Sequence, residues 1–342
     1  MSLLLVCGFL LGAFPAAAVE LPGPSKESVE MALEEISSYR HFVRASTAGP
    51  PQVDLGRLLF FDPRLSKRGT MSCATCHKPE LAWTDGLARA KSPERDALLR
   101  NTPSLLTAEY YQEMTWDGKA PGPEHAASAA IENPKEMNLE LAAVAARLKK
   151  IPAYVKLFSA AFGAEGPAPR TIGQALGAFS STLQASEDSS FDRFLKDRTG
   201  LSLAAQRGLV LYASKAGCRN CHSSLGFTDQ RFRNIGVKRG PRADLGRYPV
   251  DPREENWEAF RTPTLRNVAL TAPYMHDGSL RTLREVIDFY DRGGDDPTNT
   301  DRDLPKRLDL TSTEKDDLQE FLFALTSSTK AVTIPSLPLE TH

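Results

Sequence analysis

The sequence is short of cysteine and almost without net charge. Its 342 residues include only 5 cysteines, and 42 Lys and Arg residues nearly balance 43 Asp and Glu residues. This balance argues against a protein that follows the phosphates of a nucleic acid. Beyond the N-terminus no run approaches the roughly 20 apolar residues that a transmembrane helix needs. The length is sufficient for two domains, each with its own core.

The N-terminal stretch MSLLLVCGFLLGAFPAAAVE is an apolar run that ends in three alanines. Small residues in this place are typical of a signal-peptide cleavage site. We therefore expect residues 1–18 to be a signal peptide, cleaved near Ala18, and the mature protein to be exported to the periplasm. Removal of Cys7 leaves four cysteines, all in two tight motifs, so none is spare for a structural disulfide.

Helical periodicity dominates the rest of the chain. Apolar residues recur at spacings of three and four in LELAAVAARLKKI, TIGQALGAFSSTLQ and SLAAQRGLVLYASKAG, and the stretch 25–45 has the same character. Strand-like alternation is scarce, and Pro- and Gly-rich pieces at 117–124 and 236–252 indicate long loops. We predict an all-α protein with an N-terminal domain over 19–197, a C-terminal domain over 198–330 and a tail over 331–342.

Two Cys-x-x-Cys-His motifs carry the chemistry: Cys73, Cys76 and His77 in CATCH, and Cys218, Cys221 and His222 in CRNCH. This spacing lets two thiols attach one haem while the adjacent histidine becomes the proximal ligand of its iron. A thioredoxin-like redox pair needs no histidine there, and a zinc site would need both halves of its ligand set brought together. We predict two covalently bound haem c groups.

One stretch occurs twice. TPSLLTAEYYQEMTWDG (Thr102–Gly118) and TPTLRNVALTAPYMHDG (Thr262–Gly278) share their ends at identical spacing, but Trp116 stands in one copy where His276 stands in the other. We expect both side chains to lie where the two haem domains meet. A tryptophan there could relay electrons between the irons, although a core aromatic is the plainer interpretation.

The two copies also predict a difference at the irons. The residue twelve positions past each final glycine is Ala130 in the first half and Tyr290 in the second. An alanine cannot coordinate iron and a tyrosine oxygen can. Tyr290 also fits an apolar helical stripe as a core residue, and Met275 is a rival axial ligand, so spacing alone leaves the choice open. No histidine lies between His77 and Asn101, so the first haem should be five-coordinate.

Glu136 lies six residues past Ala130. Its carboxylate could take the proton from one oxygen of a bound peroxide and deliver it to the departing oxygen. The rival interpretation is a solvated surface glutamate. Two haems also suit a non-enzymatic electron-transfer cytochrome, which predicts two six-coordinate, low-spin haems, or a maturation factor that oxidises side chains of a protein partner.

Taken together, several stretches resemble the bacterial dihaem cytochrome c peroxidase family, in particular its MauG-type branch. The resemblance runs from about Leu55 to Leu325 through LFFDPRLS, MSCATCH, NTPSLL, WDG, ENPKEM, GCRNCH, RTPTLRNVALTAPYMHDG and TLREVIDFYDRGG. It implies two cytochrome c-like α-helical domains, each with one haem. It also implies a periplasmic peroxidase that reduces hydrogen peroxide with electrons from a protein donor, or a MauG-like enzyme that oxidises a protein substrate.

The resemblance assigns further roles. Trp116 matches the inter-haem tryptophan and Glu136 the catalytic glutamate, while Tyr290 falls at the axial tyrosine of the MauG-type branch and is favoured over Met275. A calcium ion is implied at the domain interface, held by Asn101, Thr271 and Pro273.

The chain also departs from the family pattern. Ala126 and Ala130 stand where the family has a distal glutamine and proline, and His125 is a candidate substitute. Ala216 stands where MauG has a surface tryptophan that reaches its protein substrate.

Overall fold

The computed structural model describes residues 21–38, 47–92, 97–106, 108–238, 244–297, 300–304 and 306–339. The predicted signal peptide, residues 1–18, lies outside the described residues. The helix expected over 25–45 ends at Ser37, and positions 39–46 of that expectation also lie outside. Within the described residues no helix is long and apolar enough to cross a bilayer.

The described chain is mostly helical, which confirms the predicted helical character. The only described sheet is a short antiparallel pair in which Phe232 lies opposite Arg261 and Arg233 opposite Phe260. The helix α4 begins at Pro123, inside a stretch expected to be loop, because proline suits the first turn of a helix. The elements are α1 (Lys26–Ser37), α2 (Pro50–Phe60), α3 (Cys73–Cys76), α4 (Pro123–Glu132), α5 (Leu141–Lys149), α6 (Pro152–Phe162), α7 (Pro169–Ser180), α8 (Ser190–Asp197), α9 (Leu203–Ala213), α10 (Leu283–Asp291), α11 (Ser312–Ala324), β1 (Phe232–Arg233) and β2 (Phe260–Arg261).

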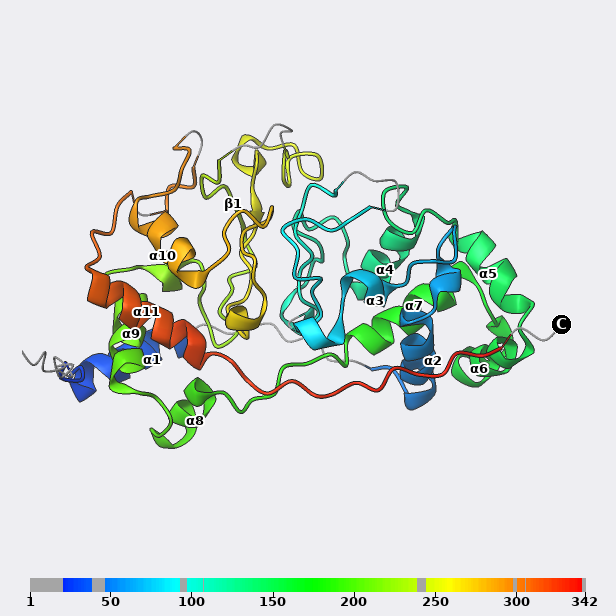
Figure 1. Cartoon of the computed structure of the whole chain (residues 1–342), viewed down its shortest axis with the longest axis horizontal. Coiled ribbons are helices and arrows are strands. Elements are labelled where there is room, and N and C mark those ends of the chain that lie inside the picture. Colours follow the sequence, from blue (N-terminus) through cyan, green and yellow to red (C-terminus); the bar gives the residue numbers. More distant parts are fainter. Residues whose placement is uncertain are drawn as a thin grey trace, which may run out of the picture.

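The helices α2 and α4 to α7 surround a first hydrophobic core, and we call this part of the chain the first half (Figure 1). The rings of Trp83 and Phe179 both meet Phe60 edge-on, with centroids 5.6 and 5.2 Å from its centroid. Helix α2 lies directly on α7 because Gly56 has no side chain: a Cβ there would stand 1.9 Å from the Ala175 carbonyl oxygen. This close crossing fixes the helix that leads into the first cysteine motif.

The second half, α8 to α11, repeats this construction around a second core. Phe227 and Tyr212 pack near Phe321 of α11, with ring centroids 6.2 and 5.1 Å from its centroid. Gly208 on α9 has the same role as Gly56 on α2, because a Cβ at position 208 would lie 2.0 Å from the Asp317 carbonyl oxygen on α11. The helix before each cysteine motif is therefore held by the same glycine contact.

The first and last described segments of the chain each pack on the core of the opposite half. Helix α1 packs on the second core through Val29, Leu33 and Ile36, beside α9 (Figure 1). The segment after α11 runs back along the molecule to the first half, where Val332 packs on the first core and the Pro338 carbonyl accepts a hydrogen bond from Arg64 Nη1 at 2.9 Å. The division at 19–197, 198–330 and 331–342 stays a prediction. The packing adds that each terminal segment lies on the core of the opposite half.

Candidate haem sites

The duplicated stretch is a structural repeat. The Met114 amide donates to the Ala120 carbonyl at 2.6 Å, and the Tyr274 amide donates to the Leu280 carbonyl at the same distance. In each copy the next residue has a left-handed backbone, with φ of 69° at Thr115 and 72° at Met275. The two loops therefore have the same local backbone geometry.

The two copies exchange hydrogen bonds with each other. The Asn101 amide donates to the His276 carbonyl at 2.7 Å, and the equivalent Arg261 amide donates to the Trp116 carbonyl at 2.9 Å. The indole Nε1 of Trp116 donates to the Asn101 carbonyl at 2.9 Å. Trp116 and His276 thus lie where the two halves meet. Since the bonds join equivalent positions, the contact has an approximate two-fold relationship.

His276 packs against an aromatic side chain at the contact between the two halves. It stacks on Phe260 with centroids 3.6 Å apart and planes 8° from parallel. Burial lowers the pKa of His276 to about 4, against the smaller opposing effects of Asp277 and Asp244. The imidazole is therefore neutral near pH 7.

Both cysteine motifs present their histidine in the same way. His77 and His222 each have a backbone amide that donates to the carbonyl of the first cysteine of its motif, at 2.9 Å in both cases. His77 Nδ1 lies 3.0 Å from the Trp83 carbonyl oxygen and His222 Nδ1 lies 3.2 Å from that of Phe227. A carbonyl partner requires Nδ1 to carry the proton, which leaves Nε2 available to a metal.

The four thiols are free and partly buried in the described structure. Burial raises the pKa of Cys73 and of Cys218 to about 12, and that of Cys76 and of Cys221 to about 11, so the reactive thiolate is disfavoured. Among the residues that the structure describes, no group of three or more His, Cys, Asp or Glu side chains could hold a metal ion. The zinc alternative therefore finds no support.

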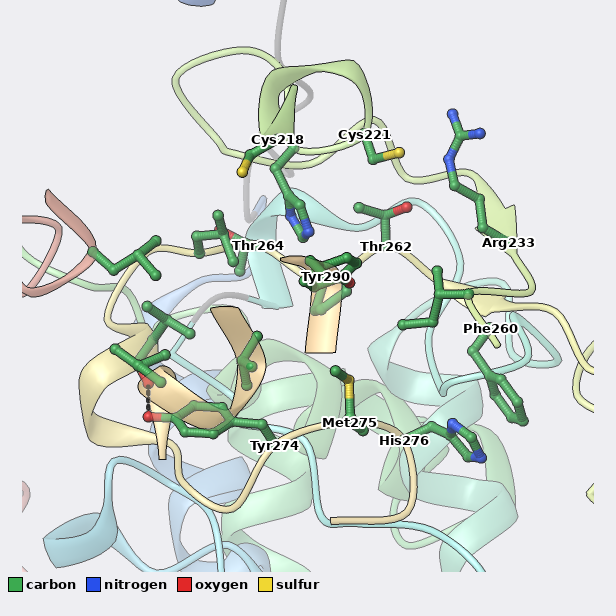
Figure 2. Close-up of a pocket in the computed structure, with 18 of the residues that line it drawn as sticks. Cys218, Cys221, Arg233, Phe260, Thr262, Thr264, Tyr274, Met275, His276 and Tyr290 are labelled. Atoms are coloured by element: carbon green, nitrogen blue, oxygen red, sulfur yellow. Dashed lines mark hydrogen bonds between the residues drawn. The ribbon is translucent and has the colours of Figure 1, made fainter. Parts of the chain in front are cut away.

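A large, mainly apolar cavity opens beside the second motif (Figure 2). In this view Tyr290 lies between the cysteine pair and Met275. Burial, and then the charges of Cys221 and Cys218, raise the pKa of the Tyr290 phenol. The apolar part of the lining includes Leu265, Val268, Leu283, Val286, Ile287, Leu308, Leu310, Leu318 and Leu322.

This cavity fits a large flat apolar group with an anionic edge. Cys218, Cys221 and His222 form one wall, where a haem would be attached. Arg261 also lines the cavity and is 6% exposed, and its buried Nε has no hydrogen-bond partner among the described residues. A haem carboxylate would supply the missing acceptor.

Glu136 is half-buried, and its charge reaches the cysteines of the first motif. Its Oε1 accepts a 2.7 Å hydrogen bond from Asn133 Nδ2, and burial raises its pKa. After burial itself, the charge of Glu136 is among the causes that raise the pKa of both Cys73 and Cys76. The half-buried side chain is thus near the thiols rather than free in solvent.

The positions aligned as Ala130 and Tyr290 lie in corresponding places, near the C-terminal ends of α4 and α10. Ala126 packs against the cluster of Ala108, Tyr111, Met114 and Ala120. His125 is 61% exposed and its Nδ1 lies 3.3 Å from Glu124 Oε1, and its role as a substitute for the distal glutamine stays a prediction.

Four further predicted positions can be placed. Asn101, Thr271 and Pro273 all line the cavity beside the second motif. The Asn101 Nδ2 donates to the Leu87 carbonyl at 2.8 Å, which leaves its Oδ1 for another partner. Ala216 is only 3% exposed, so that position has no surface side chain.

The sequence reasoning missed two features of the site. Arg261 aligns with Asn101 in the repeat, and that alignment alone could have drawn attention to it. The stacking of His276 on Phe260 carries no sequence signal, because the two residues meet only through the tertiary fold.

The chain is helical and has two Cys-x-x-Cys-His loops. A backbone carbonyl orients the histidine of each loop, and one loop lies beside an apolar cavity. Together these features define the class of two-haem proteins. Residues 50–200 match the family model described as di-haem cytochrome c peroxidase. The methylamine utilization protein MauG of Methylorubrum extorquens is 40% identical over 297 residues, 86% of this chain and 84% of that protein. The cytochrome-c peroxidase IdrP1 of Pseudomonas sp. strain SCT is 32% identical, with 81% of each chain covered.

Solved structures agree. The crystal structure of a MauG-like protein associated with microbial copper homeostasis superimposes with a TM-score of 0.77 at 33% identity, over 84% of this chain and 94% of that one. The chain belongs to the dihaem cytochrome c peroxidase family, in its MauG-type branch. It is a dihaem peroxidase, and the resemblance predicted from the motifs is confirmed.

Proposed function

We propose that this chain is a periplasmic peroxidase that reduces hydrogen peroxide to water with two electrons from a protein donor, a cytochrome c or another redox protein. The proposal is supported by its curated relatives, several of which are named cytochrome c peroxidases. One haem c is attached at Cys73 and Cys76 with His77 as iron ligand. The other is attached at Cys218 and Cys221 with His222, each in a cytochrome c-like domain. These groups supply the redox-active irons that hold the oxidising equivalents.

The observation that carries the proposal is the unequal pair Ala130 and Tyr290. Tyr290 lies in the cavity with the second motif and brings a phenol oxygen that can ligate iron. Ala130 offers only a methyl group at the corresponding place on α4. We assign peroxide binding to the first site and electron transfer to the second.

Glu136 is the proton-transfer residue in this proposal. It would accept a proton from one peroxide oxygen and return it to the other as the O–O bond breaks, so that one water leaves. The two electrons of the protein donor and two further protons then convert the remaining oxygen to a second water. Its hydrogen bond from Asn133 holds the carboxylate in one orientation.

Trp116 is proposed as the relay between the two sites. Its indole is fixed by the Asn101 carbonyl at the contact of the halves, and it lines the second cavity. Asn101 Oδ1 and the backbone oxygens of Thr271 and Pro273 are proposed to hold one calcium ion, since hard oxygen ligands suit this cation.

The test is Tyr290→Phe, which removes only the phenol oxygen. Optical and electron paramagnetic resonance spectra of the oxidised protein should change for one haem and remain unchanged for the other. Tyr274→Phe is the matched control, since Tyr274 lines the same cavity but donates to the Val268 carbonyl at 3.2 Å. Spectra of Tyr290→Phe identical to the parent's would contradict the assignment, and a change in Met275→Leu instead would identify Met275 as the ligand.

The same spectra test the alternative of a simple electron-transfer cytochrome. That protein would contain two six-coordinate, low-spin haems and would not react with stoichiometric peroxide. The proposed peroxidase has one high-spin haem whose band disappears when peroxide is added.

A further inference from the structure

Each half places an aromatic residue in the loop that follows its cysteine motif. Trp83 begins the sequence WTD in the first half, and Phe227 begins FTD in the second. Both residues have a left-handed backbone, with φ of 62° and 52°. Their carbonyl oxygens lie 3.0 Å from His77 Nδ1 and 3.2 Å from His222 Nδ1. The backbone therefore has the same role in both halves, and the side chains differ.

The indole of Trp83 is enclosed in the first core. It is 2% exposed, and its centroid lies 5.6 Å from that of Phe60 and 6.1 Å from that of Phe179, with both contacts edge-on. An indole is much easier to oxidise than a phenyl ring. An oxidising equivalent placed on Trp83 is therefore not passed on through these two neighbours, and the surrounding core shields it from solvent.

The second half builds the same cluster without an indole. Phe227 packs near Tyr212 and Phe321, with centroid distances of 5.9 and 6.2 Å. Since a phenylalanine holds this loop and fills this cluster, packing alone does not require a tryptophan at position 83.

The second cluster does contain one oxidisable ring, that of Tyr212. Its hydroxyl donates to the His222 carbonyl oxygen. A phenol loses its proton when it is oxidised, and a carbonyl oxygen accepts a hydrogen bond but is too weak a base to take that proton. An indole can lose an electron and keep its proton. The first half therefore has the better site for a stored oxidising equivalent.

Trp83 and Trp116 occupy different surroundings. Trp83 belongs to the first core, and one hydrogen bond joins its own carbonyl to His77. Trp116 lies where the two halves meet and donates to the Asn101 carbonyl. Storage on Trp83 is therefore separate from relay through Trp116.

We propose that Trp83 is a redox-active residue that stores one oxidising equivalent of the peroxide reaction when no electron donor is bound. This inference rests on the proposed attachment of a haem at the first motif. Hydrogen peroxide takes up two electrons and two protons as it becomes two water molecules. One of these electrons comes from the Trp83 indole, which becomes a radical cation and keeps its Nε1 proton, and the haem group supplies the other. An electron from the protein donor later restores the indole.

The test uses the small number of tryptophans in the chain, which are Trp83, Trp116 and Trp257. The protein is prepared with tryptophan deuterated on its indole ring, mixed with stoichiometric peroxide in the absence of donor, and frozen for electron paramagnetic resonance. In a Trp116→Phe background we expect a radical signal that is narrower with the deuterated label than without it. Adding Trp83→Phe should remove this signal.

Trp257→Phe is the matched control. The Trp257 ring packs on Tyr248, with centroids 4.9 Å apart, and it is not part of the first core. Adding this substitution to Trp116→Phe leaves Trp83 as the only tryptophan of the chain, and the radical signal should remain. Because this protein retains Trp83, it decides the question even where Trp83→Phe fails to fold, which circular dichroism checks.

The outcomes separate this inference from the proposed function. A labelled signal that survives Trp83→Phe would overturn the role of Trp83, and so would the absence of any tryptophan signal in a protein whose high-spin band disappears with peroxide. Both results leave the proposed peroxidase intact. A high-spin band that persists in the presence of peroxide would contradict the proposed peroxide site, and with it this inference.

Discussion

Glu136 combines three properties that a proton-transfer residue needs. It lies near Cys73 and Cys76, it is oriented by Asn133, and burial raises its pKa. A raised pKa brings a carboxyl closer to the working pH, where both acceptance and return of a proton are efficient.

This predicts both a rate and a pH profile. Glu136→Gln should slow the reaction with peroxide about 10²-fold or more. In the parent, Glu136 must be deprotonated to act as the base, so the rate should rise with pH through a pKa above the range of an ordinary glutamate. Stopped-flow kinetics across pH measures both effects, and Glu140→Gln, an exposed residue at the start of α5, serves as the control. A variant with the parental rate and profile would remove Glu136 from the mechanism.

At the same scale, the two cysteine motifs are visible in the sequence and their surroundings are not, while haem attachment at these residues stays a prediction. Covalent chemistry fixes the spacing of Cys73, Cys76 and His77, so the motif is visible without a fold. Spacing gives a register but no direction, so it leaves the choice between Tyr290 and Met275 open, and in the structure both residues line one cavity. The buried Oδ2 of Asp85 has no hydrogen-bond partner among the described residues, which the sequence could not predict because the tertiary structure alone sets its surroundings.

Among the helices, the crossings of α2 with α7 and of α9 with α11 depend on single glycines. Gly56→Ala should destabilise the protein by about 1–3 kcal/mol, since the added methyl group meets the backbone oxygen of Ala175 and the helices must separate. Chemical unfolding followed by circular dichroism measures the change. Gly49→Ala is the control because its Cβ would meet only ordinary contacts, and equal stabilities of the two variants would contradict the prediction.

The periodicity of the sequence located most of these helices but not their partners. The apolar stripe of α1 predicts that one face of this helix is buried. The stripe does not predict that this face packs on α9 in the second core rather than on the first core. An amphipathic pattern predicts that the apolar face of a helix is buried, but the tertiary fold determines which element packs against that face.

For the whole molecule, the two halves are connected by more than their interface. Val332 and the Pro338 carbonyl join the C-terminal segment to the first half. Deletion of the residues after Ser328 should therefore weaken protection of backbone amides near Arg64 while those of α11 remain protected. Hydrogen exchange followed by mass spectrometry tests this, with Arg64→Lys as a milder comparison that removes the fork of the donor. Unchanged exchange near Arg64 would show that the segment contributes nothing there.

The crossed ends also have a consequence for synthesis. Helix α1 has its packing surface on a part of the chain made much later, and the segment after α11 completes a region made long before it. Neither half is closed until the polypeptide is entire. Separate expression of either half, cut between α7 and α8, should therefore give a product that lacks part of its covering and aggregates.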